Sequence, residues 1–210
     1  MERIDQDHIE ALRHSRRSVA ISIPAPMLPL KGLRRPFTDP DWIYEKQYDG
    51  FRCMAAIDDG QVRLRSKGGR TCTAWFPEIT KALQMLSGGP HIIDGEVCVL
   101  DENGVSHLDR LQERARKRRL HPVSPAVTFA VFDILMHDGR SVMDVPLTER
   151  KRMLRKLLSS LDETSLLCVS DMPASTDLDV QVEGVIAKHL DSPYLAGVRS
   201  DAWLKIGRRS

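Results

Sequence analysis

The stretch EKQYDGFR, residues Glu45–Arg52, joins two segments that have the composition of β-strands. Trp42–Tyr48 and Phe51–Ile57 flank the turn signal Asp49-Gly50, and Gln61–Ser66 follows a second Asp-Gly turn. Turns as short as these connect strands that run antiparallel. This part of the chain therefore predicts successive hairpins, and not the regular alternation of strand and helix found in parallel sheets.

Three later segments have the apolar spacing of amphipathic helices: Phe76–Leu86, Leu108–Arg119 and Leu147–Leu161. We expect Thr148 to cap the last of these helices, since its hydroxyl could accept a bond from an unpaired N–H of the first turn. Strongly apolar strands lie between the helices. A small number of helices among strands joined by hairpins indicates an α+β fold with antiparallel sheets.

The composition is that of an ordinary folded protein: 210 residues, 41% hydrophobic and 29% charged, with a net charge of +2. So small a net charge does not by itself indicate nucleic-acid binding. No run of about 18 apolar residues predicts a membrane span, and the charged N-terminus lacks the apolar core of a secretion signal. The four cysteines show no metal-binding spacing. We therefore expect a cytoplasmic protein with no membrane partner.

Charged side chains beside glycines gather in three places at the ends of the expected strands. The first is Glu45–Arg52, the second is Ser66–Arg70 with the later Asp94-Gly95-Glu96, and the third is Glu183–Lys188 with Trp203-Leu204-Lys205. Lysines and arginines neutralise phosphate oxygens, and carboxylates hold Mg²⁺. Converging on one cleft, the three clusters would form a site for a polyphosphate and a divalent metal. Each cluster taken alone could instead be a solvated strand end.

In this order the clusters resemble the adenylation domain of ATP-dependent DNA ligases, most closely the bacterial end-joining type. The segments that carry the resemblance are Trp42–Glu45, Tyr48–Arg52, Ser66–Gly69, Trp75–Ile79, Asp94–Glu96, Val131–Leu135, Asp138-Gly139, Pro146–Lys151, Glu183–Lys188, Asp191–Tyr194 and Trp203–Lys205. The resemblance implies a nucleotidyltransferase (ATP-grasp-like) fold of antiparallel sheets flanked by helices, over residues 26–210. Residues 1–25 would form an N-terminal helix and arm, and we expect no OB-fold domain in this chain.

The resemblance also implies a substrate and a reaction. ATP would bind between the sheets with Mg²⁺, a lysine would take AMP from ATP, and the AMP would pass to a 5′-phosphate of nicked or broken duplex DNA. Glu45 would meet the adenine edge and Phe132 would stack on the base, although packing in the core is an equal interpretation of Phe132. Arg52 and Glu96 would lie on the ribose side.

Four further residues would surround the reacting phosphates. Lys67 would lie near the reacting end, and Glu183, together with Glu96, would hold the metal. Lys188 and Lys205 would lie against the α-phosphate. Fixed cations and Mg²⁺ there would stabilise the negative charge that develops as pyrophosphate leaves.

The sequence departs from the family at the nucleophile. The slot immediately before aromatic-Asp-Gly, which holds the lysine in the family, contains Gln47, and the nearest lysine is Lys46. A carboxamide nitrogen is barely nucleophilic, because its lone pair is delocalised into the carbonyl. Successive side chains in a strand point to opposite faces, so Lys46 should point away from the site unless a bulge intervenes. Gly207 stands where the family has a second lysine after Lys205. The candidate catalytic residues are thus Lys46, Gln47 and Lys205.

Three functions remain open from the sequence. The first is a ligase-like adenylation domain whose activity is impaired. The second is a non-catalytic pseudoligase that binds nucleotide or DNA, with phosphate contacts from Arg13, Arg16, Arg17, the basic helix Arg110–Arg119, Arg208 and Arg209. An RNA ligase or capping-type enzyme is the third. A separate OB-fold protein or another repair protein is a possible partner for the first two.

Overall fold

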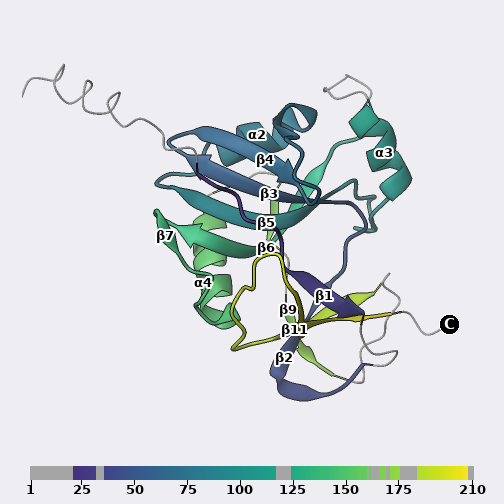
Figure 1. The fold of residues 1–210 in the computed structure, drawn as a ribbon. Coiled ribbons are helices and arrows are strands. Elements are labelled where there is room, and N and C mark those ends of the chain that lie inside the picture. The colour runs from purple at the N-terminus through teal and green to yellow at the C-terminus, as the bar shows by residue number, and fades with distance from the viewer. Residues whose placement is uncertain are drawn as a thin grey trace, which may run out of the picture.

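In the computed structural model, residues 21–31, 36–116, 124–159, 161, 166–168, 171–175 and 184–207 are described. Two β-sheets lie one above the other, and the helices lie beside the upper sheet of Figure 1. The expected N-terminal helix falls within residues 1–20, outside the described residues. Residues 21–27 have no regular secondary structure.

The larger sheet has six strands. Five of them follow one another in the order β4-β3-β5-β6-β7, all antiparallel, and β8 pairs with β6 in parallel. The strands are β3 (Phe51–Asp58), β4 (Gln61–Ser66), β5 (His91–Cys98), β6 (Thr128–His137), β7 (Arg140–Ser141) and β8 (Leu166–Cys168). The hairpin expected on either side of the second Asp-Gly turn is β3–β4. The hairpin expected across Asp49-Gly50 is wrong, because the strand before that turn, Asp39–Lys46, belongs to the other sheet.

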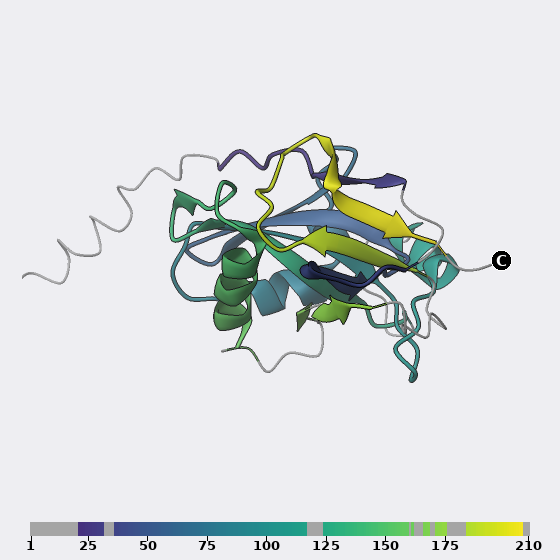
Figure 2. The same ribbon diagram turned by 90° about the horizontal axis from the view of Figure 1, so that it is seen from below.

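The smaller sheet has five strands in the order β1-β11-β10-β2-β9. They are β1 (Leu28–Lys31), β2 (Asp39–Lys46), β9 (Asp171–Ala174), β10 (Val185–His189) and β11 (Arg199–Ile206). The edge strand β1 pairs with β11 in parallel, whereas the other pairs are antiparallel. Figure 2 shows this sheet from below, with β1 at its margin.

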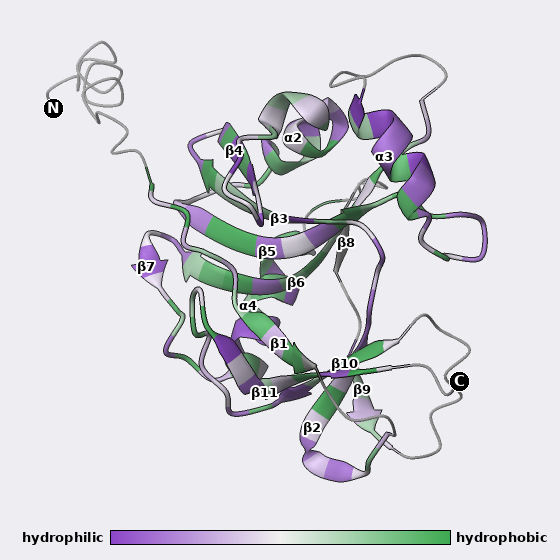
Figure 3. Cartoon of the chain, turned by 45° about the vertical axis from the view of Figure 1, so that its right-hand side comes forward, coloured by the Kyte–Doolittle hydropathy of each residue, from purple (hydrophilic) through white to green (hydrophobic). Residues whose placement is uncertain are grey.

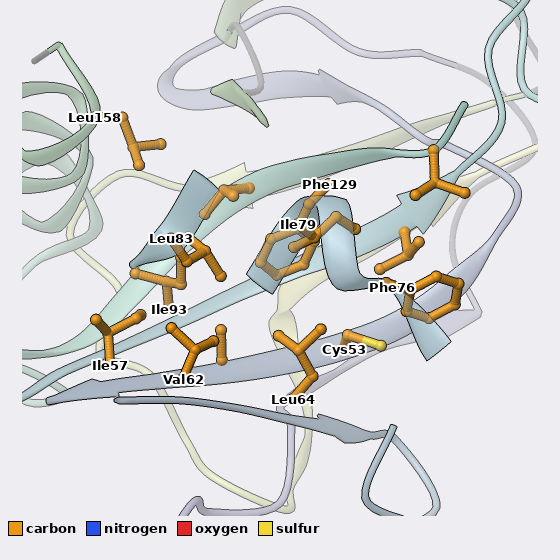
Figure 4. Close-up of a cluster of buried hydrophobic side chains, with 14 of the residues drawn as sticks. Cys53, Ile57, Val62, Leu64, Phe76, Ile79, Leu83, Ile93, Phe129 and Leu158 are labelled. Carbon is orange, nitrogen blue, oxygen red and sulfur yellow. The ribbon is translucent and has the colours of Figure 1, made fainter. Parts of the chain in front are cut away.

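The helices α2 (Pro77–Leu83), α3 (Leu108–Arg116) and α4 (Leu147–Leu158) pack on one face of the six-stranded sheet, here called the outer face, together with the short 3₁₀ helix Thr73–Trp75. The largest apolar cluster lies there, with Cys53 and Ile57 of β3 and Phe129 of β6 facing Phe76, Ile79 and Leu158 (Figure 4). This cluster is the hydrophobic core that holds the helices.

The opposite face of the six-stranded sheet, here called the inner face, looks toward the five-stranded sheet. A smaller apolar cluster joins the two sheets there. The six-stranded sheet contributes Met54, Ala56, Ile92 and Leu135, and the five-stranded sheet with its connecting segments contributes Met27, Tyr194 and Trp203. Along β5, purple bands interrupt the green ones in Figure 3, since this strand contains Asp94 and Glu96 among apolar residues. Successive side chains of a strand point to opposite faces, so one strand can contribute to a core on one face and to a polar cleft on the other.

The α+β nucleotidyltransferase class expected from the sequence is confirmed, and the two parallel pairings at β1 and β8 add to the antiparallel pattern. The expectation that Thr148 caps α4 is wrong. Pro146 occupies the N-cap position without a side-chain cap, and Thr148 is the second helical residue. The N–H of Thr148 donates to the Leu190 carbonyl at 3.1 Å, so this donor of the first turn needs no capping hydroxyl. No helix in the described part of the chain is long and apolar enough to cross a membrane.

Candidate functional site

A cavity of about 340 Å³ opens between the inner faces of the two sheets. Its wall includes nine of the residues singled out from the sequence: Glu45, Lys46, Gln47, Arg52, Lys67, Glu96, Phe132, Lys188 and Lys205. They come from β2, β3, β5, β6, β10, β11 and the turn after β4, so the fold brings together groups up to 160 residues apart. Glu183 lies outside the described residues.

A buried carboxylate of the cavity wall, Glu45, contacts two lysines, of which Lys188 also lines the cavity. The Glu45 oxygens lie 2.5 Å from Nζ of Lys151, on α4, and 2.7 Å from Nζ of Lys188, on β10. All three side chains are almost completely buried. Burial lowers the pKa of Lys188 to about 8, since Glu45 offsets this only partly and the second lysine adds to it. Burial also works against the charge on Lys151, but there the attraction of Glu45 prevails and the pKa rises.

Arg52 is held by a second buried carboxylate. Its Nε and Nη2 donate to the two oxygens of Asp94, at 2.6 and 2.7 Å, and the Tyr194 hydroxyl donates to Oδ2 of the same carboxylate at 2.5 Å. Burial opposes the charge on the guanidinium, but Asp94 raises the Arg52 pKa overall. Burial and the negative charge of Asp94 both raise the pKa of the Tyr194 hydroxyl. The guanidinium is therefore fixed in place before any ligand enters.

Phe132 is half-buried and lies against two cations. The Arg52 guanidinium carbon and Nζ of Lys188 are each 4.4 Å from the centre of its ring, and the Lys188 amine is 4.0 Å from the Trp203 ring. Trp203 also contacts Phe132 edge to face, with ring centres 6.2 Å apart. The negative faces of aromatic rings attract cations, and this attraction is stronger away from water. Phe132 thus contributes to the cavity wall and is not only a core residue.

Gln47 and Lys46 occupy different environments, although both line the cavity. Gln47 follows Glu45 by two residues, on the side of β2 whose partner Ile186 also lines the cavity. Its Oε1 is buried and accepts no hydrogen bond from the described residues, and its backbone N–H donates to the Gly184 carbonyl at 3.1 Å. Gly184 has a φ of +139°, a conformation that other residues rarely adopt, and it lies in van der Waals range of this oxygen.

Lys46 pairs with Val185, which belongs to the apolar cluster on the other side of β2. Strict alternation would carry Lys46 out of the cavity, but β2 ends at this residue and the amine reaches the cavity rim instead. There Nζ donates to the Gly104 carbonyl at 2.5 Å and lies 5.2 Å from the centre of the Tyr48 ring. The amine is therefore engaged by a loop carbonyl, and it is not grouped with Lys188 and Lys205.

Glu96 is a partly buried carboxylate of the cavity wall. Within the described part of the chain it has no ion pair or hydrogen bond, and burial raises its pKa to about 8 against the opposing attraction of Arg52. Lys67 and Lys205 are exposed at the rim. A desolvated carboxylate facing several cations is an oxygen donor suited to a hard divalent ion such as Mg²⁺.

The sequence did not identify the residues that hold these groups. Asp94, Lys151 and Tyr194 each belong to a quoted segment, but no pattern showed that they would meet Arg52 or Glu45 across the fold. A charged side chain that becomes buried requires a partner of opposite charge. An Arg or Glu within an apolar strand therefore signals that a partner exists, but not which residue it is. Arg114, one of the basic residues expected to contact phosphates, is instead buried and paired with Glu78 at 3.1 Å. Arg110 and Arg116 are exposed.

Comparison with known proteins identifies the family to which the chain is similar. A family model described as "ATP dependent DNA ligase domain" matches residues 26–207. The multifunctional non-homologous end joining protein LigD of Mycolicibacterium smegmatis is 33% identical over 86% of this chain and 23% of its own length. The SPbeta prophage-derived DNA ligase-like protein LigB of Bacillus subtilis is 31% identical over 87% of this chain and 66% of its own.

Among solved structures, a mycobacterial DNA ligase D complexed with ATP and MES superposes with a TM-score of 0.76 and 32% identity. The match covers 89% of this chain and 61% of that one. The chain thus spans under a quarter of the length of the LigD relative, and about three fifths of the matched LigD crystal chain.

Proposed function

The chain belongs to the ATP-dependent DNA ligase family, as an adenylation domain, and on this premise we propose that its cavity binds ATP with Mg²⁺ but attaches AMP to itself weakly or not at all. One observation carries the second half of this proposal. The side chain on the cavity side of β2 at the nucleophile slot is the carboxamide of Gln47, and the neighbouring Lys46 amine is bound to a loop carbonyl.

Support for nucleotide binding comes from the shape and charge of the wall. A base would stack on Phe132, which has aromatic and cationic neighbours. The Glu45 carboxylate would accept a hydrogen bond from the adenine amino group while it keeps its two lysines. Lys188 and Lys205 would approach the α-phosphate, and Arg52, oriented by Asp94, would lie on the ribose side.

Glu96, and Glu183 if it lies at the same rim, would hold the metal ion. When bound, Mg²⁺ would neutralise charge on the phosphate oxygens and the leaving pyrophosphate. The desolvated, unpaired carboxylate of Glu96 fits this use, because a nearby cation would stabilise its charged form.

The step of self-adenylation that we expect to be slow or absent is formation of the N–P bond. Transfer of AMP to the protein requires a neutral nitrogen lone pair that attacks the α-phosphorus while the bond to pyrophosphate breaks. The lone pair of the Gln47 amide is delocalised, and the Lys46 amine would have to leave Gly104 and turn toward the cavity. We therefore expect nucleotide binding without efficient covalent capture.

Intact-mass measurement after incubation with ATP and Mg²⁺ tests this proposal. The wild-type chain is expected to gain little or no AMP, and the exchange variant Lys46→Gln/Gln47→Lys is expected to gain one AMP at residue 47. Lys46→Gln alone is the matched control. Stoichiometric adduct on wild-type Lys46 would overturn the proposed impairment. Absence of any ATP binding by calorimetry, in wild type and exchange variant alike, would overturn the nucleotide site.

We further propose that the nucleic-acid partner is nicked or broken duplex DNA, engaged with a separate OB-fold or repair protein. Family membership supports this, and Arg110 and Arg116 offer exposed cations on α3. If they contact phosphates, the affinity for nicked duplex falls steeply with salt, and Arg110→Ala/Arg116→Ala reduces the slope of log affinity against log salt by about 2. Arg152→Ala/Arg155→Ala on α4 is the matched control. Binding that does not depend on salt would exclude these contacts.

A further inference from the structure

At the β7 end of the six-stranded sheet (Figure 1), two histidines and an aspartate meet outside the cavity. His91 is the first residue of β5, His137 is the last residue of β6, and Asp138 follows in the turn to β7. One ligand atom from each lies within 4.8 Å of the others. Glu96 lies five residues along β5, roughly 17 Å away at the rise of a strand, so this cluster is separate from the nucleotide cavity.

The two imidazoles face each other through the same nitrogen. Nδ1 of His91 lies 3.3 Å from Nδ1 of His137, and the rings are stacked at an angle of 24° with centres 5.1 Å apart. Two zinc-bound nitrogens, each with a bond of about 2.0–2.1 Å and a tetrahedral angle between them, would be about 3.3 Å apart. The two nitrogens are hydrogen-bonded to each other, and their separation equals that of two ligands of one tetrahedral ion, so an ion that replaces the shared proton would need little movement of the rings.

The tautomer of His91 follows from its backbone neighbours. Its Nε2 lies 3.3 Å from the Ser87 carbonyl, which can only accept, so Nε2 carries the proton. The backbone N–H of Asp138 donates to Nδ1 at 3.3 Å, which also identifies Nδ1 as the unprotonated nitrogen, and Nδ1 of His137 donates to the same atom. A metal ion at Nδ1 would take the place of these hydrogen bonds. A histidine whose second nitrogen donates to a carbonyl is the usual arrangement of a metal ligand.

The third ligand is available from the turn. The Asp138 carboxylate oxygens are 3.7 Å from Nε2 of His91 and 3.8 Å from Nε2 of His137, beyond hydrogen-bond distance, and Oδ1 accepts from the Gly89 N–H at 3.2 Å. Its side chain is 62% exposed, so it can rotate toward the two Nδ1 atoms. His91 is buried and fixed, whereas His137 is 30% exposed and leaves a path for an ion from solvent.

We propose that His91, His137 and Asp138 form a binding site for a divalent transition metal, best suited to Zn²⁺, with a water as the fourth ligand. Imidazole nitrogens favour zinc over magnesium and calcium, which prefer oxygen. The bound ion would link the loop before β5, through His91, to the β6–β7 turn. The site goes beyond the proposed ligase-type function and does not require ATP or DNA.

Metal titration of the whole chain tests the site. Chelator-treated protein is titrated with ZnCl₂ by calorimetry, and the imidazole nitrogens are followed by NMR. We expect one Zn²⁺ per chain, with the Nδ1 signals of His91 and His137 shifting together. His137→Leu should weaken binding by roughly 100-fold or more, since a ligand contributes more than the roughly 10–100-fold of outer-shell groups. Asp138→Asn, on an exposed side chain, should weaken it less.

His107→Leu is the matched control, because His107 pairs with Asp101 at 3.1 Å without a second histidine nearby in the described residues. It should leave zinc affinity unchanged. Circular dichroism of each metal-free variant shows that loss of binding is not loss of folding. Zinc binding that is equal in wild type and His137→Leu, or that is absent at 100-fold molar excess over protein, overturns the proposal.

Discussion

Phe129 and Phe132 lie three residues apart on β6, yet they belong to different parts of the molecule. Phe129 is fully buried in the apolar cluster under the helices, whereas Phe132 lines the cavity beside two cations. The outer face of the sheet contains the largest apolar cluster, and the inner face near the cavity contains Asp94 and Glu96. We therefore expect the outer face to determine the stability of the fold and the inner face to determine which ligand binds.

The outer face should be the more sensitive of the two to truncation. Phe129→Ala leaves a cavity among tightly packed side chains, so the free energy of unfolding should fall by about 4 kcal/mol. Urea denaturation measures this loss. If Phe132→Ala destabilises the chain just as much, the division between the faces is wrong.

Removal of a buried charge from the cavity wall should cause the second-largest loss of stability. Glu45→Gln removes the counter-charge of both Lys151 and Lys188, and a buried ion pair that loses one partner is strongly destabilised, here by about 3 kcal/mol. Denaturation of Glu149→Gln provides the control. Glu149 forms an exposed pair with Arg152 on the same helix as Lys151, so its loss should cost under about 0.5 kcal/mol. Equal effects of the two changes would contradict the assigned role of burial.

Phe132→Ala should mainly affect ligand affinity. Loss of the stacking surface and of its two cation contacts should weaken ATP binding by roughly 10-fold, or about 1.4 kcal/mol. Calorimetry with ATP and Mg²⁺ measures this, with Phe129→Leu as a control that keeps an apolar side chain on the other face. Undiminished affinity in Phe132→Ala would place the base elsewhere.

The pH dependence of Lys188 should give the smallest effect. Its pKa of about 8 in the folded chain lies below the ordinary value of 10.5, so the unfolded state binds more protons above pH 8. The contribution of this group to stability therefore rises with pH, by about 1 kcal/mol between pH 7 and pH 9. Comparison of wild type with Lys188→Met at both pH values isolates this term. A difference that stays constant, or that falls, would contradict the low pKa.

The sequence predicted most of what depends on local pattern. The helix expected within Phe76–Leu86 is α2, Asp58-Asp59-Gly60 marks a hairpin, and the order of the charged segments indicated that one cavity would collect them. Partners far apart in sequence were not predictable. Glu45 and Lys151 are 106 residues apart, and His91 and His137 are 46 apart, so neither pair has a spacing that local periodicity can reveal. They become neighbours only through the order of strands in the sheets.

Adjacent residues on one turn of α4 contact both halves of the fold. Arg150 donates to Asp133 of the six-stranded sheet, and Lys151 pairs with Glu45 of the five-stranded sheet. Their backbones are about 3.8 Å apart, a fixed covalent distance. On this side the helix therefore ties the two sheets together, so an opening of the cleft that keeps both ion pairs has to widen it elsewhere.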